Sequence, residues 1–153
     1  MPKPTPFLWF NNDAEAAADF YLTVFPNSRK LSELRANEAG PGPIGSLIVL
    51  DLELDGQQVT FLNGGPAHQL TEAFSFSVLC QTQAEIDTYW TKLTADGGSE
   101  IACGWLKDKF GLCWQIVPTG LRELLSHPAA MRAMMAMKRM DIAILQQAAN
   151  QPG

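Results

Sequence analysis

The chain has few cysteines and few basic residues, and each shortage excludes a class of protein. Its 153 residues include three cysteines, Cys80, Cys103 and Cys113, an odd set without C-x-x-C spacing. This pattern indicates neither a disulfide framework nor a cysteine zinc site, and a reducing cytoplasm is the expected location. The 11 Lys and Arg face 16 Asp and Glu and form no basic run, so we expect no nucleic-acid partner.

Long apolar segments are also missing. The longest charge-free runs are about a dozen residues, short of the roughly 20 that span a bilayer, and no signal peptide precedes Phe7. We therefore expect no membrane partner. The hydrophobic content of 46% is ample for a packed core, and the length predicts a single domain, residues 1–153.

The most informative stretch is a two-faced hairpin at residues 103–118. Two short apolar runs flank the charged turn Lys107–Gly111, and Pro118 ends the second run because it cannot donate to a strand ladder. The second run alternates between two faces, with Leu112, Trp114 and Ile116 on one and Cys113, Gln115 and Val117 on the other. This alternation predicts one buried face, with Trp114 in the core, and a second face that carries a thiol and an amide.

The chain repeats one order of elements. A short apolar strand, residues 7–10, leads through helix-capping residues into a helix at 13–25, and Asp55-Gly56 joins two further alternating runs as a hairpin. The second half opens on a strand at 74–80, followed by the capping box Thr82–Glu85 and a second helix. The repeat predicts an α+β fold of two β-α-β-β-β modules, at about 5–63 and 74–118, whose sheet curves around a cavity.

A different pattern follows Pro118. Five of the six methionines fall within residues 131–140, and the apolar spacing predicts a C-terminal helix over about 119–149. A helix so apolar on several faces must be covered by the barrel or by another subunit. A packing helix is favoured over a Met-rich groove for a ligand or partner.

Several motifs together resemble one protein family. They are Phe20-Tyr21 with residues 24–28, residues 63–66 (Asn-Gly-Gly-Pro), residues 83–90, and residues 103–118. In these, the chain resembles the PhnB-like group of the glyoxalase/bleomycin-resistance (vicinal oxygen chelate) superfamily, a group also labelled 3-demethylubiquinone-9 3-methyltransferase. The resemblance implies paired modules and a homodimer, possibly with modules paired across chains. An uncovered sheet edge and the Met-rich helix also favour a dimer.

The resemblance further implies where a metal would bind. Enzymes of the superfamily usually hold a divalent ion with four His, Glu or Gln side chains, and the matching positions here are Pro6, Phe61, Ser75 and Gln115. Proline and phenylalanine offer no ligand atom, and one amide cannot hold a transition metal, so we expect no metal. His68 and His127 lie outside these strands and are interpreted as ordinary loop residues.

Two other kinds of chemistry find little support. Residues 40–45 match G-x-G-x-x-G, but two of the six are prolines and a strand follows, so no nucleotide or S-adenosylmethionine site, and no cofactor, is predicted. By alternation Cys103 and Cys113 could face the cavity near a cation that lowers the thiol pKa. The favoured interpretation is that these free cysteines are small buried hydrophobes.

What remains is a cavity for a small organic molecule. Period-two alternation turns polar and aromatic side chains toward it. The candidates are Phe61, Asn63, Ser75, Ser77, Cys103, Trp105, Cys113 and Gln115. That these polar groups only satisfy one another is an equally open interpretation. We expect a metal-free binding module; the alternative is a superfamily lyase, isomerase or methyltransferase that works without the usual metal, and no catalytic residue is identified.

Overall fold

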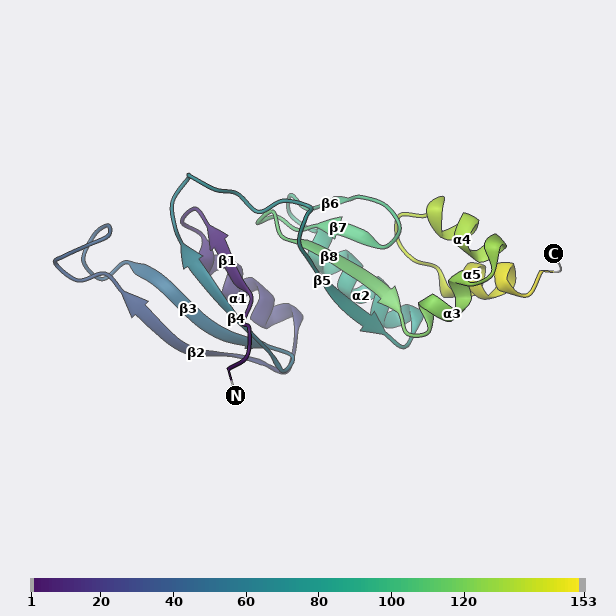
Figure 1. Cartoon of the computed structure of the whole chain (residues 1–153), viewed down its shortest axis with the longest axis horizontal. Helices are drawn as coiled ribbons and strands as arrows, with labels where there is room; N and C mark the ends of the chain where they lie inside the picture. Colours follow the sequence, from purple (N-terminus) through teal and green to yellow (C-terminus); the bar gives the residue numbers. More distant parts are fainter. Residues whose placement is uncertain (1, 152–153) are drawn as a thin grey trace. The chain divides into compact units, whose positions relative to one another are not determined.

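A computed structural model describes residues 2–151 of the chain. Its contacts divide the chain into two compact units, Met1–Leu70 and Thr71–Gly153, each with its own four-stranded sheet (Figure 1). No helix in the described part of the chain is long and apolar enough to cross a membrane.

The first unit is one β-α-β-β-β module. Its elements are β1 (Phe7–Phe10), α1 (Ala14–Val24), β2 (Ser28–Arg35), β3 (Leu47–Leu54) and β4 (Gln57–Asn63). The sheet order is β1-β4-β3-β2, with β1 parallel to β4 and the other pairs antiparallel. The predicted turn between β3 and β4 forms, with Asp55 and Gly56 both at positive φ, as a tight hairpin requires.

Helix α1 packs its apolar stripe on one face of this sheet. Ala17, Tyr21 and Val24 are buried there, at the spacing of one side of a helix. The N-cap residue Asp13 makes no side-chain capping bond; the first helical N–H, that of Ala14, donates instead to Oδ1 of Asn63 at 2.9 Å. The start of α1 is therefore tied to the end of β4.

The second unit repeats the module. Its elements are β5 (Ser75–Cys80), α2 (Gln83–Thr94), β6 (Ser99–Glu100), β7 (Trp105–Lys107) and β8 (Cys113–Pro118). The sheet order is β5-β8-β7-β6, with β5 parallel to β8. The predicted capping box forms with one difference: Thr82 Oγ1 accepts from the N–H of Glu85, and the Glu85 carboxylate accepts from the N–H of Gln81, the residue before the cap. The prediction of paired modules in an α+β fold is confirmed.

The C-terminal segment differs from the single helix predicted for 119–149. It forms three short helices, α3 (Leu121–Leu125), α4 (Pro128–Met135) and α5 (Ile142–Ala149); we call residues 119–151 the C-terminal arm. Between α4 and α5 the carbonyls of Met137 and Lys138 accept from the N–H groups of Cys103 and Gly104. These bonds to the second module replace helical bonds and break the helix.

Candidate functional site

The second sheet has two chemically different faces. Partners across a ladder share a face, so Phe76, Trp114 and Leu106 lie together on the face that packs against α2. We call the opposite side the distal face; by the same pairing its residues are Ser75, Ser77, Leu79, Trp105, Lys107, Cys113, Gln115 and Val117. The prediction that Trp114 is a core residue is confirmed, since it is only 2% exposed.

A groove of about 600 Å³ lies on part of the distal face. Strand residues Ser77, Leu79, Gln115 and Val117 line it on one side, and residues 118–123, the end of β8 and the start of the C-terminal arm, line it on the other. We call it the sheet groove. Two predicted site residues, Ser77 and Gln115, are therefore part of a concave surface.

The amide of Gln115 is only partly satisfied. Its Nε2 donates to Oγ of Ser75 at 2.9 Å, which brings a third predicted residue into the same polar group. Within residues 2–151 the amide oxygen of Gln115 accepts no hydrogen bond. The hydrogen bond to Ser75 therefore uses the amide nitrogen of Gln115, and the amide oxygen is left to accept a hydrogen bond from another molecule.

Two more predicted residues share the distal face outside the groove lining. Trp105 lies directly opposite Gln115 in the ladder and is half-buried. Cys113 lies opposite Lys107 and is fully buried. Burial raises the pKa of the Cys113 thiol, and although Lys107 pulls it down, Glu72 and Asp108 add to the rise. Burial outweighs the pull of Lys107, so Cys113 fits the favoured interpretation of a small buried hydrophobe and not the alternative of an activated thiol.

Cys103 does not belong to a strand face. It lies in the turn before β7, with φ at 55°, and its N–H donates to the carbonyl of Met137. The interpretation that alternation could turn Cys103 toward the cavity is wrong, because strand geometry begins only after Gly104. Gly104 itself adopts φ of 83°, and a Cβ there would lie 3.0 Å from the carbonyl oxygen of Ile116.

Phe61 and Asn63 were predicted on the cavity face, and this is wrong. Phe61 is fully buried in the core of the first unit, with its ring centroid 4.8 Å from Phe10 and 5.8 Å from Tyr21 of α1. Asn63 accepts from Ala14 and donates to the carbonyl of Leu47. Both side chains lie on the helix side of the sheet.

The connection from β1 to α1 is one residue longer than the connection from β5 to α2. The last buried position of β1, Phe10, lies three residues before the helix cap Asp13, whereas Cys80 lies two residues before Thr82. Counting strand positions back from the helices therefore slips by one, and a one-residue slip exchanges the two faces of a strand.

This slip misplaces Pro6, and Phe61 is misplaced as well, so two of the four expected metal positions are wrong. Pro6 precedes β1, and Phe61 faces the core; the pair that faces away from α1 is Phe7 with Thr60. Among the residues that the structure describes, no three His, Cys, Asp or Glu side chains lie together as a metal site would need. His68 is an exposed loop residue whose ring meets Trp9 edge-on at 4.8 Å.

A buried carboxylate on the β7–β8 turn was missed by the sequence reasoning. Asp108 is 2% exposed and accepts from the N–H groups of Phe110 and Leu112 and from the indole of Trp114, the last at 2.8 Å. An aspartate in a charged turn before Gly111 is a signal for such a turn, since its side chain can bond nearby N–H groups. Its role here is to hold the hairpin that carries Gln115.

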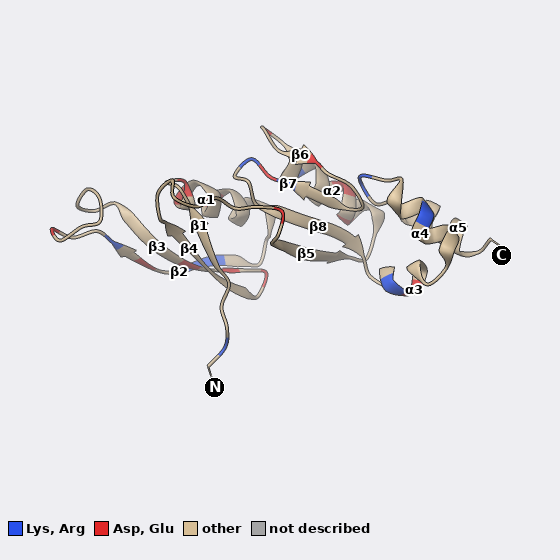
Figure 2. Cartoon of the chain, turned by 45° about the horizontal axis from the view of Figure 1, so that its top comes forward, with Lys and Arg blue, Asp and Glu red and all other residues tan. Residues whose placement is uncertain are grey.

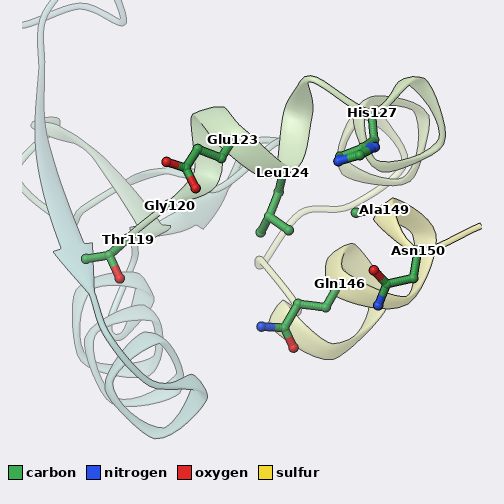
Figure 3. Close-up of a pocket in the computed structure, with 8 residues that line it drawn as sticks. All are labelled: Thr119, Gly120, Glu123, Leu124, His127, Gln146, Ala149 and Asn150. Atoms are coloured by element: carbon green, nitrogen blue, oxygen red, sulfur yellow. The ribbon is translucent and has the colours of Figure 1, made fainter.

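A second hollow, of about 500 Å³, lies within the C-terminal arm (Figure 3). Gln146 and Asn150 from α5 line it together with His127, which precedes α4. Its polar side chains are exposed, and the Glu123 carboxylate points away from Gln146 and Asn150 (Figure 3). None of the eight predicted site residues lines this hollow.

The family model of the 3-demethylubiquinone-9 3-methyltransferases matches residues 2–117. The chain belongs to this family. It is 34% identical to the PhnB protein of Bacillus cereus, with a TM-score of 0.70 over 77% of this chain and 100% of that one. The resemblance to the PhnB-like group is thereby confirmed.

More distant solved structures share the fold alone. Protein PA1353 of Pseudomonas aeruginosa is 20% identical over 76% of this chain and 96% of its own, with a TM-score of 0.61. The fosfomycin resistance protein FosX of Mesorhizobium loti is 14% identical over 82% and 97%, with a TM-score of 0.56. No curated protein matches the chain.

Several residues that carry the family resemblance build the fold. Asn63 holds the start of α1, and a side chain at Gly64 would collide with the ring of Trp9. Asp108 and Trp114 fix the β7–β8 hairpin to the core. Family membership therefore explains the architecture, and the chemistry must be argued from the sheet groove.

Proposed function

We propose that this chain binds a small organic molecule in the sheet groove and does so without a metal ion. The observation that carries the proposal is the position of Gln115, which lines a groove of about 600 Å³ and whose amide oxygen accepts no hydrogen bond within residues 2–151. Binding sites of this size typically combine an apolar surface with a few polar groups that orient the ligand.

The lining of the groove has this composition. Leu79 is 65% exposed, and together with Val117 and Leu121 it offers apolar contact. Gln115 and Ser77 supply an acceptor and a hydroxyl on the same face, since they are direct partners in the β5–β8 ladder. A ligand with an apolar body and a hydrogen-bonding group fits this pattern.

Binding is favoured over catalysis by the state of the nearby thiol. Cys113 is fully buried and its pKa is raised, which suits neither a nucleophile nor a metal ligand at neutral pH. The methyltransferase label gains no support from residues 40–45, which lie between β2 and β3 and open no helix. An enzyme of the superfamily that works without a metal remains the alternative.

We also propose that the chain is a cytoplasmic homodimer. Each unit leaves large apolar side chains uncovered: Phe7 (59% exposed) and Leu34 (57%) in the first, and Phe74 (41%) in the second. A second copy that covers these surfaces would remove them from water. Light scattering at micromolar concentration tests the dimer, and a monomer would contradict it.

The binding proposal is tested with a fragment library of small amphiphilic molecules, followed by amide NMR signals of the full chain. Ligands of the groove should shift the side-chain amide of Gln115, and Gln115→Ala should weaken them. Gln147→Ala, an exposed glutamine on α5 that does not line the groove, is the matched control.

Parallel thermal-shift measurements with Zn²⁺, Ni²⁺, Mn²⁺ and S-adenosylmethionine test the metal-free part, since a ligand of the native state raises its stability. Stabilisation by a metal, or one metal per chain after dialysis, would contradict it. Stabilisation by S-adenosylmethionine would favour the enzyme alternative.

A further inference from the structure

The sheet groove has one wall that the family model does not include. The match ends at residue 117, while Thr119, Leu121, Arg122 and Glu123 of the C-terminal arm all line the groove. Half of the residues that line the groove thus belong to the C-terminal arm. Their side chains can distinguish ligands that would bind equally well to the strand residues shared with the family.

Arg122 is the one positively charged residue in this lining. Within residues 2–151 it forms no ion pair, whereas Arg29, Arg35 and Arg139 each pair with a carboxylate. A guanidinium carries its donors in a planar fork that matches a carboxylate or phosphate oxygen pair. Figure 2 shows the basic and acidic colouring of α3 at the end of the second sheet.

We infer that Arg122 makes the sheet groove selective for amphiphilic anions, molecules with an apolar chain and a carboxylate head group. This rests on the proposed function, because it names the ligand class of the same groove. The apolar chain lies against Leu79 and Val117, and the head group lies at the rim where Arg122 emerges from α3.

Glu123 sets a limit on this selectivity. Its carboxylate lines the same groove and repels an anion, so the preference is the difference between one attractive and one repulsive charge. Both side chains are exposed, and interactions between exposed charges are weak in water. The expected effect of each residue on affinity is therefore a small factor, with opposite signs.

The test uses hexanoate, hexanol and hexylamine as probes, which share one apolar chain and differ in head-group charge. Dissociation constants are measured on the full chain by NMR titration, from the side-chain amide of Gln115 and the backbone N–H of Gly120. Hexanoate should bind most tightly and hexylamine most weakly.

Three variants separate the contributions. Arg122→Gln should weaken hexanoate by roughly threefold and leave hexanol unchanged, while Glu123→Gln should strengthen hexanoate by a similar factor. Arg132→Gln is the matched control: Arg132 lies on α4, forms no ion pair within residues 2–151 and does not line the groove. Arg132→Gln should change the affinity for neither hexanoate nor hexanol.

Three results would overturn the inference. If hexanoate and hexanol bind equally, or if Arg122→Gln weakens both equally, the groove binds by its apolar surface alone and only the charge selectivity fails. If none of the probes, and no member of the fragment library, shifts the signals of Gln115 and Gly120, the proposed function fails as well.

Discussion

The two units share one strand order but secure their helices in different ways. In the first, the N-terminus of α1 depends on Asn63, which is 49 residues away along the chain. In the second, Thr82 and Glu85 cap α2 locally. The contrast shows that a repeated architecture can be stabilised by distant contacts in one copy and by neighbouring residues in the other.

The units also differ in what their distal faces present. In the first sheet Asp51 accepts from Ser32 at 2.8 Å and from Thr60 at 2.6 Å, so its carboxylate is used within the sheet. Figure 2 shows acidic and basic segments interspersed along β2, where Arg35 pairs with Glu33 and Glu15. In the second sheet Gln115 keeps a free acceptor beside a groove. The candidate site for a ligand is therefore placed in the second unit.

The largest expected effect concerns the aromatic cores that the units have in common. Phe61→Ala and Trp114→Ala should each lower the free energy of unfolding by roughly 3 to 5 kcal/mol, because both remove a buried aromatic ring. Urea unfolding of each variant measures this. A cost below that of Gln115→Ala for either variant would mean that its side chain does not face the core.

A buried thiol should make the second unit sensitive to alkali. Burial raises the pKa of Cys80 from 9.0 to about 11, and the equivalent residue in the first unit is Phe10, which does not titrate. The unfolded thiol ionises before the folded one, so the contribution to stability is complete below pH 9.0 and is lost as the pH rises to about 11.

The free energy of unfolding should fall by about 2 kcal/mol between pH 8 and pH 11. Urea unfolding over this pH range measures the change. Cys80→Ala is the control: whatever its stability at neutral pH, its slope over this window should be shallower than that of the unmodified chain. Equal slopes would show that the thiol does not titrate as its burial indicates.

The two helix starts should respond unequally to loss of their caps. Asn63→Ala removes one acceptor and one donor from part-buried bonds and should cost about 2 kcal/mol, whereas Thr82→Ala removes a local cap and should cost about 1 kcal/mol. Chemical unfolding of both variants measures the difference. A reversed order would contradict the role given to Asn63.

A mild effect on stability is expected on the distal face of the second sheet. Gln115→Ala should cost less than about 1.5 kcal/mol, because water in a half-exposed groove can replace the lost amide as the hydrogen-bond partner of Ser75. It should weaken ligands of the groove more than it weakens folding. A large loss of stability, with ligand affinity unchanged, would assign Gln115 to the scaffold.

Local signals made much of the fold predictable. Asp55-Gly56, the capping box at Thr82 and the alternation around Trp114 each act over a few residues, and each is present in the structure. The face of Phe61 was not predictable in this way, because β4 has apolar residues on both of its faces near this position and an error of one residue in register exchanges the two faces of a strand.

The rest depended on contacts between distant segments. The break between α4 and α5 arises from bonds to Cys103 and Gly104, which lie more than thirty residues earlier in the chain. The sheet groove likewise needs residues 118–123 to turn beside the strands. No local pattern in either segment predicts these long-range contacts. Alternation along the strands therefore identified Ser77 and Gln115 but not Arg122.

The junction between the C-terminal arm and the second module has a consequence for hydrogen exchange. The side-chain amide of Gln83 donates to the carbonyl of Met140 and accepts from the N–H of Ile142, and the N–H groups of Cys103 and Gly104 bond only to the arm. Three backbone protons, those of Cys103, Gly104 and Ile142, are thus protected by docking of the arm. They should exchange with solvent deuterium at one common opening rate, which reports how often the wall that carries Arg122 leaves the groove.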